Sequence, residues 1–351
     1  MKQIIPEMGK LYAAHEPFAL ATVISRNGSA PRSAGAKMLV KTDGKTLGTV
    51  GGGILEAQVQ RLAAQMIAER RATIQAFQFD GKDAATMDAI CGGQVEVLVE
   101  WVDPADPRTA ELIQGLQAVI AQHRKAWWIT LLPTRAAGVT DHVLVQADGQ
   151  IVGELPLGLA LESILDARLP VRMELDQQQA IIEPIQIAGT AYIFGAGHVS
   201  RSLAGFVKAV GFWTVVLDDR VEYANRERFP EADLLIVLDS FSDWVGKIPV
   251  DRDSFIVIVT RGHQNDLTVL AQALKLDAGY IGMIGSRRKC ELIFQELRRM
   301  GYGEENIQRV HAPIGIPIGA ETPEEIGVSI VAEMIQARAK LQRQPVESVK
   351  G

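Results

Sequence analysis

The strongest constraint on the fold is a series of short apolar runs that alternate with helical stretches from about residue 188 onward. In chain order the runs are AYIFG, WTVVLD, DLLIVLD, SFIVIVT, YIGMIGS and RVHAP. Strands of a parallel sheet are buried on both faces and read as such runs, and helices connect them. The sequence therefore predicts an α/β domain with a doubly wound parallel sheet over residues 188–341.

A glycine pattern follows the first of these runs. Gly195, Gly197 and Ser200 form a G-x-G-x-x-S sequence that leads into a helical pattern, and Asp218 ends the next apolar run. In a Rossmann-like fold the first glycine permits a tight turn and the second lets a pyrophosphate approach the backbone. A carboxylate after the second strand binds ribose. The pattern predicts a nucleotide site; the alternative is a turn whose glycines serve packing alone.

Polar and basic residues follow the other strands of the predicted sheet. Ligands of open parallel sheets bind at the carboxyl ends of the strands, so we expect these residues to lie around one crevice. The helix dipole disfavours arginines at a helix start. Their presence indicates an anionic ligand, although a solvated helix face is the alternative. The residues concerned are His198, Arg261, His263, Ser286, Arg287, Arg288, Lys289 and His311.

Because three of these residues are histidines, a metal site is a second interpretation. A zinc site needs three or four ligands at defined spacing, and neither an H-x-x-x-H nor a C-x-x-C sequence is present. We therefore expect His198, His263 and His311 to bind phosphate or to cap neighbouring groups.

Residues 1–102 read as an α+β domain with glycine-rich loops. The three loops are GSAPRSAGAK, TVGGGILE and ICGGQVEV. Gly51, Gly52 and Gly53 directly precede a helical pattern, so free N–H groups and the helix dipole would both favour an anion there. Arg32 would add a bidentate phosphate contact.

Cys91 is the residue of these loops whose side chain can act as a nucleophile or a soft metal ligand. Gly92 and Gly93 follow it, so little shields its thiol. A thiolate is a soft ligand that suits a late or highly charged metal centre, whereas many lone cysteines are small buried hydrophobes. The residues alone leave both interpretations open. The other cysteine, Cys290, lies in a helical pattern, and we expect it in the core.

A middle region, residues 103–187, separates these two parts. The sequence DPADPR breaks the preceding pattern, and a helix, a strand AWWITLLPT, the hairpin-like HVLVQADGQIVGEL and a short helix follow it. The region contains no chemical motif. It packs against one neighbour or the other, and the sequence leaves that choice open.

The charge composition argues against nucleic acid and membrane surfaces as binding partners. The formal net charge is −6 and the pI about 5.6, whereas proteins that bind nucleic acid or a membrane surface carry a basic face. No apolar stretch reaches the ~18 residues of a membrane span, and the N-terminus has no cleavage-like site. Two cysteines are too few for a disulfide framework, so a cytoplasmic setting is expected.

Several of these strings resemble the XdhC/CoxI family. GSAPRSAGAKMLV, GTVGGGILE and CGGQVEVLVE are similar to the family's N-terminal domain. Its C-terminal Rossmann domain is similar to YIFGAGHVSRSLA, VVLDDR, ANRERFPEAD, VTRGHQND, YIGMIGSRRK and HAPIGIPIGAETPEEIGVSIVAEMI. The similarity spans nearly all of the chain apart from the middle region.

The resemblance implies a function. The family is described as molybdenum-cofactor chaperones that bind a molybdopterin-type cofactor, support its terminal sulfuration and hand it to an apo molybdenum hydroxylase of the xanthine dehydrogenase type. Glycine loops and arginines would then hold the phosphate, and Cys91 would touch the molybdenum or a sulfur in transfer. The Rossmann crevice would hold the pterin's nucleotide or an NAD(P)-like molecule. The expected cofactor-binding residues are Arg32, Gly51, Gly52, Gly53, Glu56, Cys91, Gly92, Gly93, Gly195, Gly197, His198, Ser200, Asp218, Arg261, His263, Ser286 and Arg287.

Two other functions stay open from the sequence. Gly195, Gly197 and Asp218 also suit an NAD(P)-dependent oxidoreductase, although no hydride-transfer apparatus is evident. Cys91 would alternatively carry a persulfide, with a cysteine desulfurase as partner. The apolar AWWITLL and the resemblance lead us to expect a homodimer.

Overall fold

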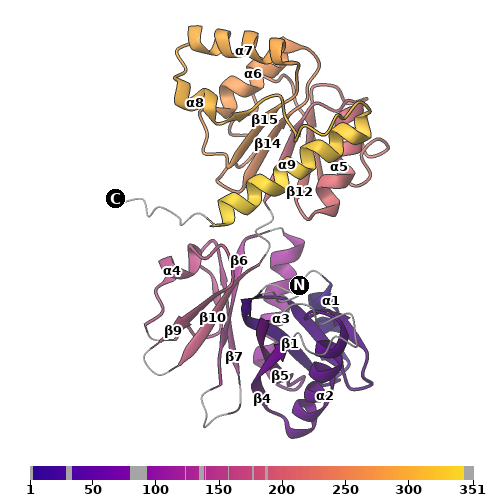
Figure 1. The fold of residues 1–351 in the computed structure, drawn as a ribbon, viewed down its shortest axis with the longest axis vertical. Helices are drawn as coiled ribbons and strands as arrows, with labels where there is room; N and C mark the ends of the chain where they lie inside the picture. The colour runs from indigo at the N-terminus through magenta and orange to yellow at the C-terminus, as the bar shows by residue number, and fades with distance from the viewer. Residues whose placement is uncertain are drawn as a thin grey trace. The chain divides into compact units, whose positions relative to one another are not determined.

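The chain divides into two compact units, Met1–Gln186 and Ile187–Gly351, and each is described by itself (Figure 1). The computed structural model describes residues 3–28, 34–79, 93–122, 124–133, 138, 140–156, 158–175, 178–185 and 189–343. No helix in these ranges is long and apolar enough to cross a membrane.

The first part of unit 1 is an antiparallel five-stranded sheet with a long helix on one face. The strand order is β3-β2-β1-β5-β4. Leu55, Val59 and Met66 of α2 pack against strand residues such as Ala21 and Val97. The strand residues that face α2 are therefore buried, while β3 and β4 keep exposed residues at the two edges of the sheet. The elements are α1 (Ile4–Ala13), β1 (Phe18–Gly28), β2 (Lys37–Lys41), β3 (Thr46–Gly48), α2 (Gly53–Glu69), β4 (Ala72–Phe79) and β5 (Gly93–Val102).

A second antiparallel sheet completes unit 1, with strand order β8-β7-β6-β10-β9. Its central strand β6 is AWWITL, and all six residues are buried. This apolar run therefore lies in the core of unit 1, and the interpretation of it as a dimer surface is wrong. The elements are α3 (Pro107–Ala121), β6 (Ala126–Leu131), β7 (Asp141–Gln146), β8 (Ile151–Val152), α4 (Leu161–Leu165), β9 (Val171–Glu174) and β10 (Gln179–Ile185).

A buried ion pair and a buried contact between a histidine and a carboxylate join the two sheets of unit 1. Lys37 on β2 lies 2.6 Å from a carboxylate oxygen of Glu183 on β10, and both side chains are almost fully buried. Glu100 on β5 contacts His142 Nε2 on β7 at 2.8 Å. Removing one partner of such a pair would strand a buried charge, so these contacts fix how the two sheets face each other.

Unit 2 confirms the predicted parallel sheet. All six apolar runs are strands, and their order is β13-β12-β11-β14-β15-β16. This is the Rossmann order. The strand order reverses between β11 and β14, the first and fourth strands of the sheet in chain order. The elements are β11 (Thr190–Phe194), α5 (His198–Ala209), β12 (Trp213–Asp218), β13 (Leu234–Val237), β14 (Ser254–Ile258), α6 (His263–Ala273), β15 (Tyr280–Met283), α7 (Arg287–Arg299), α8 (Glu304–Gln308), β16 (Val310–His311) and α9 (Pro323–Arg343).

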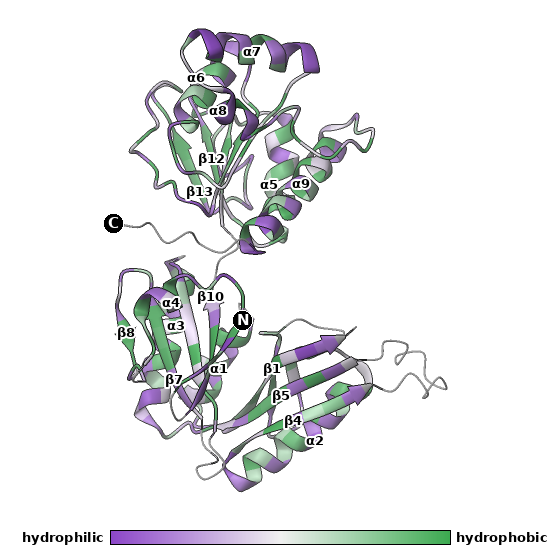
Figure 2. Ribbon diagram, turned by 60° about the vertical axis from the view of Figure 1, so that its left-hand side comes forward, coloured by the Kyte–Doolittle hydropathy of each residue, from purple (hydrophilic) through white to green (hydrophobic). Residues whose placement is uncertain are grey.

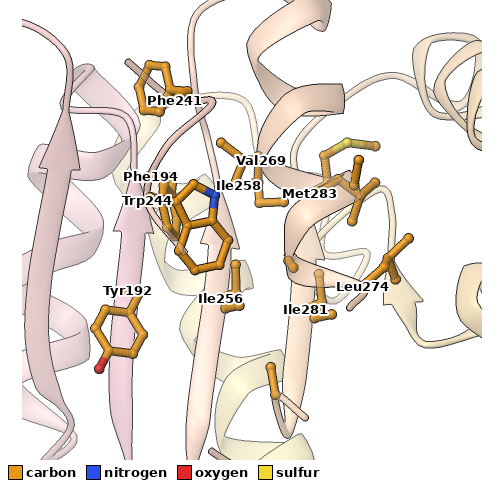
Figure 3. Packing of buried hydrophobic residues seen from close by; sticks show 14 of the residues in the cluster. Tyr192, Phe194, Phe241, Trp244, Ile256, Ile258, Val269, Leu274, Ile281 and Met283 are labelled. Atoms are coloured by element: carbon orange, nitrogen blue, oxygen red, sulfur yellow. The ribbon is translucent and has the colours of Figure 1, made fainter. Parts of the chain in front are cut away.

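Helices cover both faces of this sheet. Helices α5 and α9 lie side by side on one face, and α6 and α7 cover the other (Figure 1). Figure 3 shows the second face, where Phe194, Trp244 and Ile258 pack together. In Figure 2 strands β12 and β13 are green, whereas α7 carries purple and green residues. The predicted core position of Cys290 is confirmed, because its side chain is buried on α7.

Candidate functional site

The loop after β11 depends on glycine at its first position. Gly195 has φ +103°, and an added Cβ would lie 2.5 Å from the carbonyl oxygen of Val259 and 2.8 Å from Thr260 Cα. The loop after β11 therefore touches the loop after β14, which only glycine permits. Gly197 differs, because its φ is −79° and an added Cβ would meet nothing within 4 Å. Gly197 thus leaves open space beside the start of α5.

Ser200 on α5 is hydrogen-bonded to the loop after β11. It is fully buried, and its hydroxyl donates to the carbonyl oxygen of Gly195. In a Rossmann-like fold a small residue at this position lets the helix pack closely on the strand, and the burial of Ser200 is consistent with that packing. The hydroxyl itself faces the protein, so it orients the loop.

Asp218 ends β12, and its carboxylate is bonded on both oxygens. Oδ2 accepts the Ala196 N–H at 2.7 Å and an Arg220 Nη2 hydrogen at 3.1 Å. Oδ1 accepts from the Nε of Arg220 at 2.8 Å and from its backbone N–H at 3.1 Å. Burial raises the pKa of the Asp218 carboxyl, but the bonds from Arg220 and Ala196 lower it more, so the pKa lies below its ordinary value. Asp218 is therefore an ionised tie between β12 and the glycine loop.

Two arginines that follow β12 were missed from the sequence. Arg220 lies 3.8 Å from the centre of the Tyr223 ring, and Arg228 lies 5.0 Å from the same ring. An Arg228 Nη2 hydrogen is donated to the carbonyl oxygen of Ala196 at 3.4 Å, and its Nε is buried without a partner among the described residues. The signal that could have found them is the basic residues that directly follow the acidic strand end, in VVLDDR and ANRERF.

Helix α6 begins in the loop after β14. Its N-cap is Gly262, with φ +82° and no side-chain cap, and His263 is its first residue. Arg261 precedes them and contacts Asp219 at 3.2 Å, while its side chain stays 56% exposed. The start of α6 therefore offers uncapped N–H groups beside an exposed guanidinium.

Helix α7 begins after β15 with a cap of its own. The hydroxyl of Ser286 accepts the Lys289 N–H at 3.2 Å. Lys289 also pairs with the fully buried carboxylate of Asp266, which accepts from the hydroxyl of Thr260 at 2.6 Å. Lys289 thus joins the start of α7 to the start of α6, while Ser286 caps α7. Arg287 is exposed and has no ion pair with a described residue.

These loops meet at the carboxyl ends of parallel strands. We call residues 195–201, 218–220, 260–263 and 285–288 the carboxyl edge. Three helices start there, and α5 and α6 lack a side-chain cap. His198, Arg201, Arg287 and Arg288 are exposed there without an ion pair to a described residue. Uncapped N–H groups and unpaired cations together favour an anionic ligand.

His311 lies apart from the loop histidines in a network of its own. Its Nδ1 contacts Glu333 of α9 at 3.0 Å, and its ring lies 4.6 Å from the ring of Tyr280. Glu333 also accepts from the hydroxyl of Tyr280 at 2.7 Å and from the Gly315 N–H at 2.8 Å. Burial raises the pKa of Glu333, but these donors lower it more. Within the described ranges, no three His, Cys, Asp or Glu side chains are grouped to hold a metal ion.

The glycine loop of unit 1 has its N–H groups already occupied. The carboxylate of Glu56 accepts the Gly52 N–H at 3.0 Å and the hydroxyl of Thr49, and that hydroxyl accepts the Gly51 N–H at 3.1 Å. Burial raises the pKa of Glu56, but these donors hold it below its ordinary value. The expectation of free N–H groups at Gly51 and Gly52 is therefore wrong, because Thr49 and the carboxylate of Glu56 on α2 accept their hydrogen bonds. Gly53, the first residue of α2, is exposed.

The remaining predicted residues of unit 1 fall at or beyond the edge of the described ranges. Arg32, Cys91 and Gly92 lie outside the described residues. Gly93 is the first residue of β5, and its cross-strand partners are Gly28 at the end of β1 and Phe79 at the end of β4. Gly28, Phe79 and Gly93, which border the undescribed segments 29–33 and 80–92, are thus neighbours in the sheet.

Comparison with known families fits both units. A model described as the XdhC and CoxI family matches residues 11–78, and one described as the XdhC Rossmann domain matches residues 191–334. Together the two matches cover more than half of the chain, and the chain belongs to the XdhC and CoxI family.

Three curated relatives are similar along most of the chain. The uncharacterized protein YqeB of Escherichia coli K12 is 27% identical over 95% of the chain, which spans only 46% of YqeB. A protein of Bacillus subtilis 168 named as a probable subunit of xanthine dehydrogenase is 27% identical over 93% of the chain and 94% of its own length. The molybdenum cofactor insertion chaperone PaoD of Escherichia coli K12 is 22% identical over 91% and 83%.

A solved structure matches almost the whole chain. A crystal structure described as a xanthine dehydrogenase from Bacillus halodurans has a TM-score of 0.78 and 27% identity, covering 98% of both chains. The likeness therefore includes both units and the sheets that each contains.

Proposed function

We propose that this chain is a chaperone that binds the molybdenum cofactor, matures it and inserts it into a molybdenum hydroxylase of the xanthine dehydrogenase type. The observation that carries the proposal is the similarity to PaoD, named a molybdenum cofactor insertion chaperone, across 91% of the chain. Membership in the XdhC and CoxI family and the relative named as part of a xanthine dehydrogenase support it. The client enzyme would be an apo hydroxylase, and the setting cytoplasmic.

The carboxyl edge suits the phosphate-bearing end of a molybdopterin. Gly197 leaves open space at the start of α5, where the N–H groups have no side-chain cap. The buried Nε of Arg228, beside Ala196, lacks a partner among the described residues. His198, Arg261, His263 and Arg287 would add donors to the same phosphate. When bound, the cofactor supplies the molybdenum and its dithiolene sulfurs, while this chain's residues bind and orient the phosphate.

Cys91 is the proposed contact to the molybdenum or to a sulfur in transfer. Its thiolate, with Arg32 and Gly92, forms the part of the proposal that depends on residues outside the described ranges. A cysteine desulfurase would be the sulfur donor if Cys91 carries a persulfide. A homodimer stays a proposal that rests on the resemblance.

The direct test is loading of the full-length chain in cells that make the cofactor. We expect the purified chain to carry pterin, measured by fluorescence after oxidation, and to raise the activity of an apo molybdenum hydroxylase. Arg287→Ala should lower the bound pterin, whereas Arg299→Ala should leave it unchanged. Arg299 ends the same helix and is also exposed, with an ion pair to Glu296 that is itself exposed. Absence of pterin from the wild-type chain would refute the proposal.

Cys91→Ala separates the metal contact from phosphate binding. We expect this variant to bind the pterin more weakly or to deliver a cofactor that leaves the hydroxylase inactive. If binding and activation are both unchanged, Cys91 has no such contact. Persulfide formation is tested by mass spectrometry after incubation with a cysteine desulfurase, and an unmodified Cys91 would remove the sulfur-transfer role.

An NAD(P)-dependent oxidoreductase is the second candidate, favoured by the Rossmann strand order and the glycine loop after β11. Turnover would be measured as a change in reduced-nicotinamide absorbance with a panel of small carbonyl and hydroxyl substrates. We expect no turnover. Substrate-dependent oxidation of the nicotinamide would favour this candidate over the chaperone.

A further inference from the structure

The carboxylate that would bind a ribose diol in a Rossmann fold is not free in this chain. That position belongs to Asp218, and a ribose diol binds there by donating its hydroxyl hydrogens to the carboxylate. Asp218 is only 1% exposed and accepts four hydrogen bonds, from Ala196 and Arg220. A diol would have to replace these donors, and Arg220 would then lose its buried counter-ion. A ribose diol would therefore gain little binding free energy from Asp218.

The exposed group at the same end of the crevice is a cation. Arg261 reaches over from the loop after β14 and lies 3.2 Å from Asp219, the residue after Asp218. Asp219 also lies 3.6 Å from Arg220. Exposed pairs such as Arg261–Asp219 contribute little to stability, so an anion displaces Asp219 from Arg261 easily. A phosphate would bind the guanidinium in a bidentate manner, which is stronger than the contact it replaces.

The five charged side chains in contact around the end of β12 and the glycine loop include one more cation than anion. Asp218 and Asp219 contribute two negative charges, and Arg220, Arg228 and Arg261 contribute three positive charges. Arg228 adds a buried Nε without a partner beside the glycine loop, a donor that the protein's own described contacts leave unsatisfied. Such a donor is available to a phosphate oxygen of a ligand or to water.

We propose that the crevice of unit 2 binds a nucleotide whose ribose carries an additional phosphate, with that phosphate on Arg261. The diphosphate lies at the uncapped start of α5, over Gly197. Nucleotides with this chemistry carry the extra phosphate on the 2′ or the 3′ oxygen of the ribose, as NADP and coenzyme A do. The inference concerns unit 2 alone and does not require that the chain carries a pterin. Because the proposed function assigns Arg261 and the start of α5 to the pterin's phosphate, the nucleotide and the pterin would compete for these groups.

The test is a binding titration of the full-length chain by calorimetry with three nucleotides. These are adenosine 2′,5′-bisphosphate, adenosine 3′,5′-bisphosphate and adenosine 5′-monophosphate. We expect one bisphosphate to bind at least about tenfold more tightly than the monophosphate, a difference of about 1.4 kcal/mol. The preferred isomer identifies the source, since the 2′ isomer represents NADP and the 3′ isomer represents coenzyme A.

Arg261→Ala should reduce this preference to about twofold or less, while weak binding of the monophosphate stays the same. Arg299→Ala, at the far end of α7, is the matched control and should keep the full preference. Equal binding of all three nucleotides, or tighter binding of the monophosphate, would overturn the inference, and so would absence of binding by all three. None of these probes contains a pterin, so the outcome is independent of the cofactor-loading experiment.

Discussion

Two glycine loops in this chain lead into a helix in similar ways, one before α2 in unit 1 and one before α5 in unit 2. In the first loop, Gly51 and Gly52 donate to Thr49 and Glu56, so the protein supplies its own anion. In the second loop, α5 starts without a side-chain cap and Gly197 faces open space. A glycine loop at a helix start can therefore bind an anionic ligand only where no nearby carboxylate of the chain accepts its N–H groups.

One position in the helix accounts for much of the difference. The fourth residue of α2 is Glu56, and the fourth residue of α5 is Arg201. A carboxylate at this position can turn back to the N–H groups of the first turn, whereas an arginine repels their positive end. Helix α6 has Asp266 at its fourth position, but Thr260 and Lys289 hold that carboxylate in the interior. The start of α6 therefore stays open like that of α5.

Gly195→Ala should have the largest effect, because it tests whether the loop after β11 needs glycine for its shape. The added Cβ would meet the Val259 carbonyl oxygen at 2.5 Å, at a φ of +103°. We expect a loss of about 3 kcal/mol in the free energy of unfolding, from backbone strain and crowding together. Denaturant unfolding of the full-length chain measures it.

Gly44→Ala is the control for that substitution. Gly44 also has a positive φ, of +81°, but an added Cβ there meets nothing within 4 Å. Its loss should be about 1 kcal/mol, from backbone strain alone. Equal losses at the two positions would mean that the contact between the two loops does not constrain Gly195.

Asp218→Asn should have the next largest effect. The variant keeps an acceptor for the Ala196 N–H but loses the charge that pairs with Arg220, so we expect a loss of about 2 kcal/mol at pH 7. The pKa of Asp218 is lowered in the folded chain. Its stabilising effect is therefore present above about 3.9, the ordinary value for aspartate, and is lost as the pH falls through the lower folded value.

The same substitution can be followed at the loop itself. Hydrogen exchange of the Ala196 amide should be faster in Asp218→Asn than in the wild type at pH 7. The stability difference between the two proteins should shrink as the pH falls below about 4. The unfolded wild-type chain then binds a proton that the folded chain, with its lower pKa at Asp218, takes up only at still lower pH. A difference that stays constant across this range would show that the ionised carboxylate is not what holds the loop.

Gly197→Ala should spare stability and weaken ligand binding. Its φ of −79° suits alanine and the added Cβ has open space, so the free energy of unfolding should fall by less than about 1 kcal/mol. The Cβ would occupy the space in which a phosphate approaches the backbone. We expect the affinity for inorganic pyrophosphate to fall about tenfold. Unchanged affinity in a calorimetric titration would place the anion elsewhere.

Glu56→Ala should have a small effect on stability and open the loop before α2 to an anion, as the loop before α5 is open. Removing the carboxylate leaves the Gly52 N–H without its partner, which should cost about 1 kcal/mol. The emptied loop should then bind pyrophosphate weakly. Glu56→Gln is the matched variant, because its amide oxygen still accepts from Gly52, and it should bind no pyrophosphate there. Identical behaviour of both variants would argue against the self-capping of this loop.

The sequence predicts the strands of unit 2 well and its side-chain contacts poorly. Each strand is an apolar run bounded by glycine or a polar residue, and burial on both faces makes such runs easy to recognise. The position of Asp218 at the end of β12 follows from the same pattern. Its pairing with Arg220 and Ala196 does not, because it depends on how two loops meet in space.

The two errors in unit 1 have similar causes. AWWITL is an apolar run, and a run alone does not distinguish a buried central strand from an exposed surface. The glycines before α2 predicted an anion-binding site. The N–H groups do bind an anion, but it is the carboxylate of Glu56, three residues after Gly53 in the same chain. A glutamate at the fourth position of the following helix distinguishes the loop before α2 from the loop before α5, whereas Asp266 at the same position of α6 does not cap its helix because Thr260 and Lys289 hold it.

The most direct test of the difference between the two loops is an NMR titration of the full-length chain with inorganic pyrophosphate. Backbone amide signals of Gly197, His198 and Gly262 should shift in a saturable way, while those of Gly51 and Gly52 should stay in place. The opposite result, saturable shifts at Gly51 and Gly52 with none at Gly197, would contradict the account.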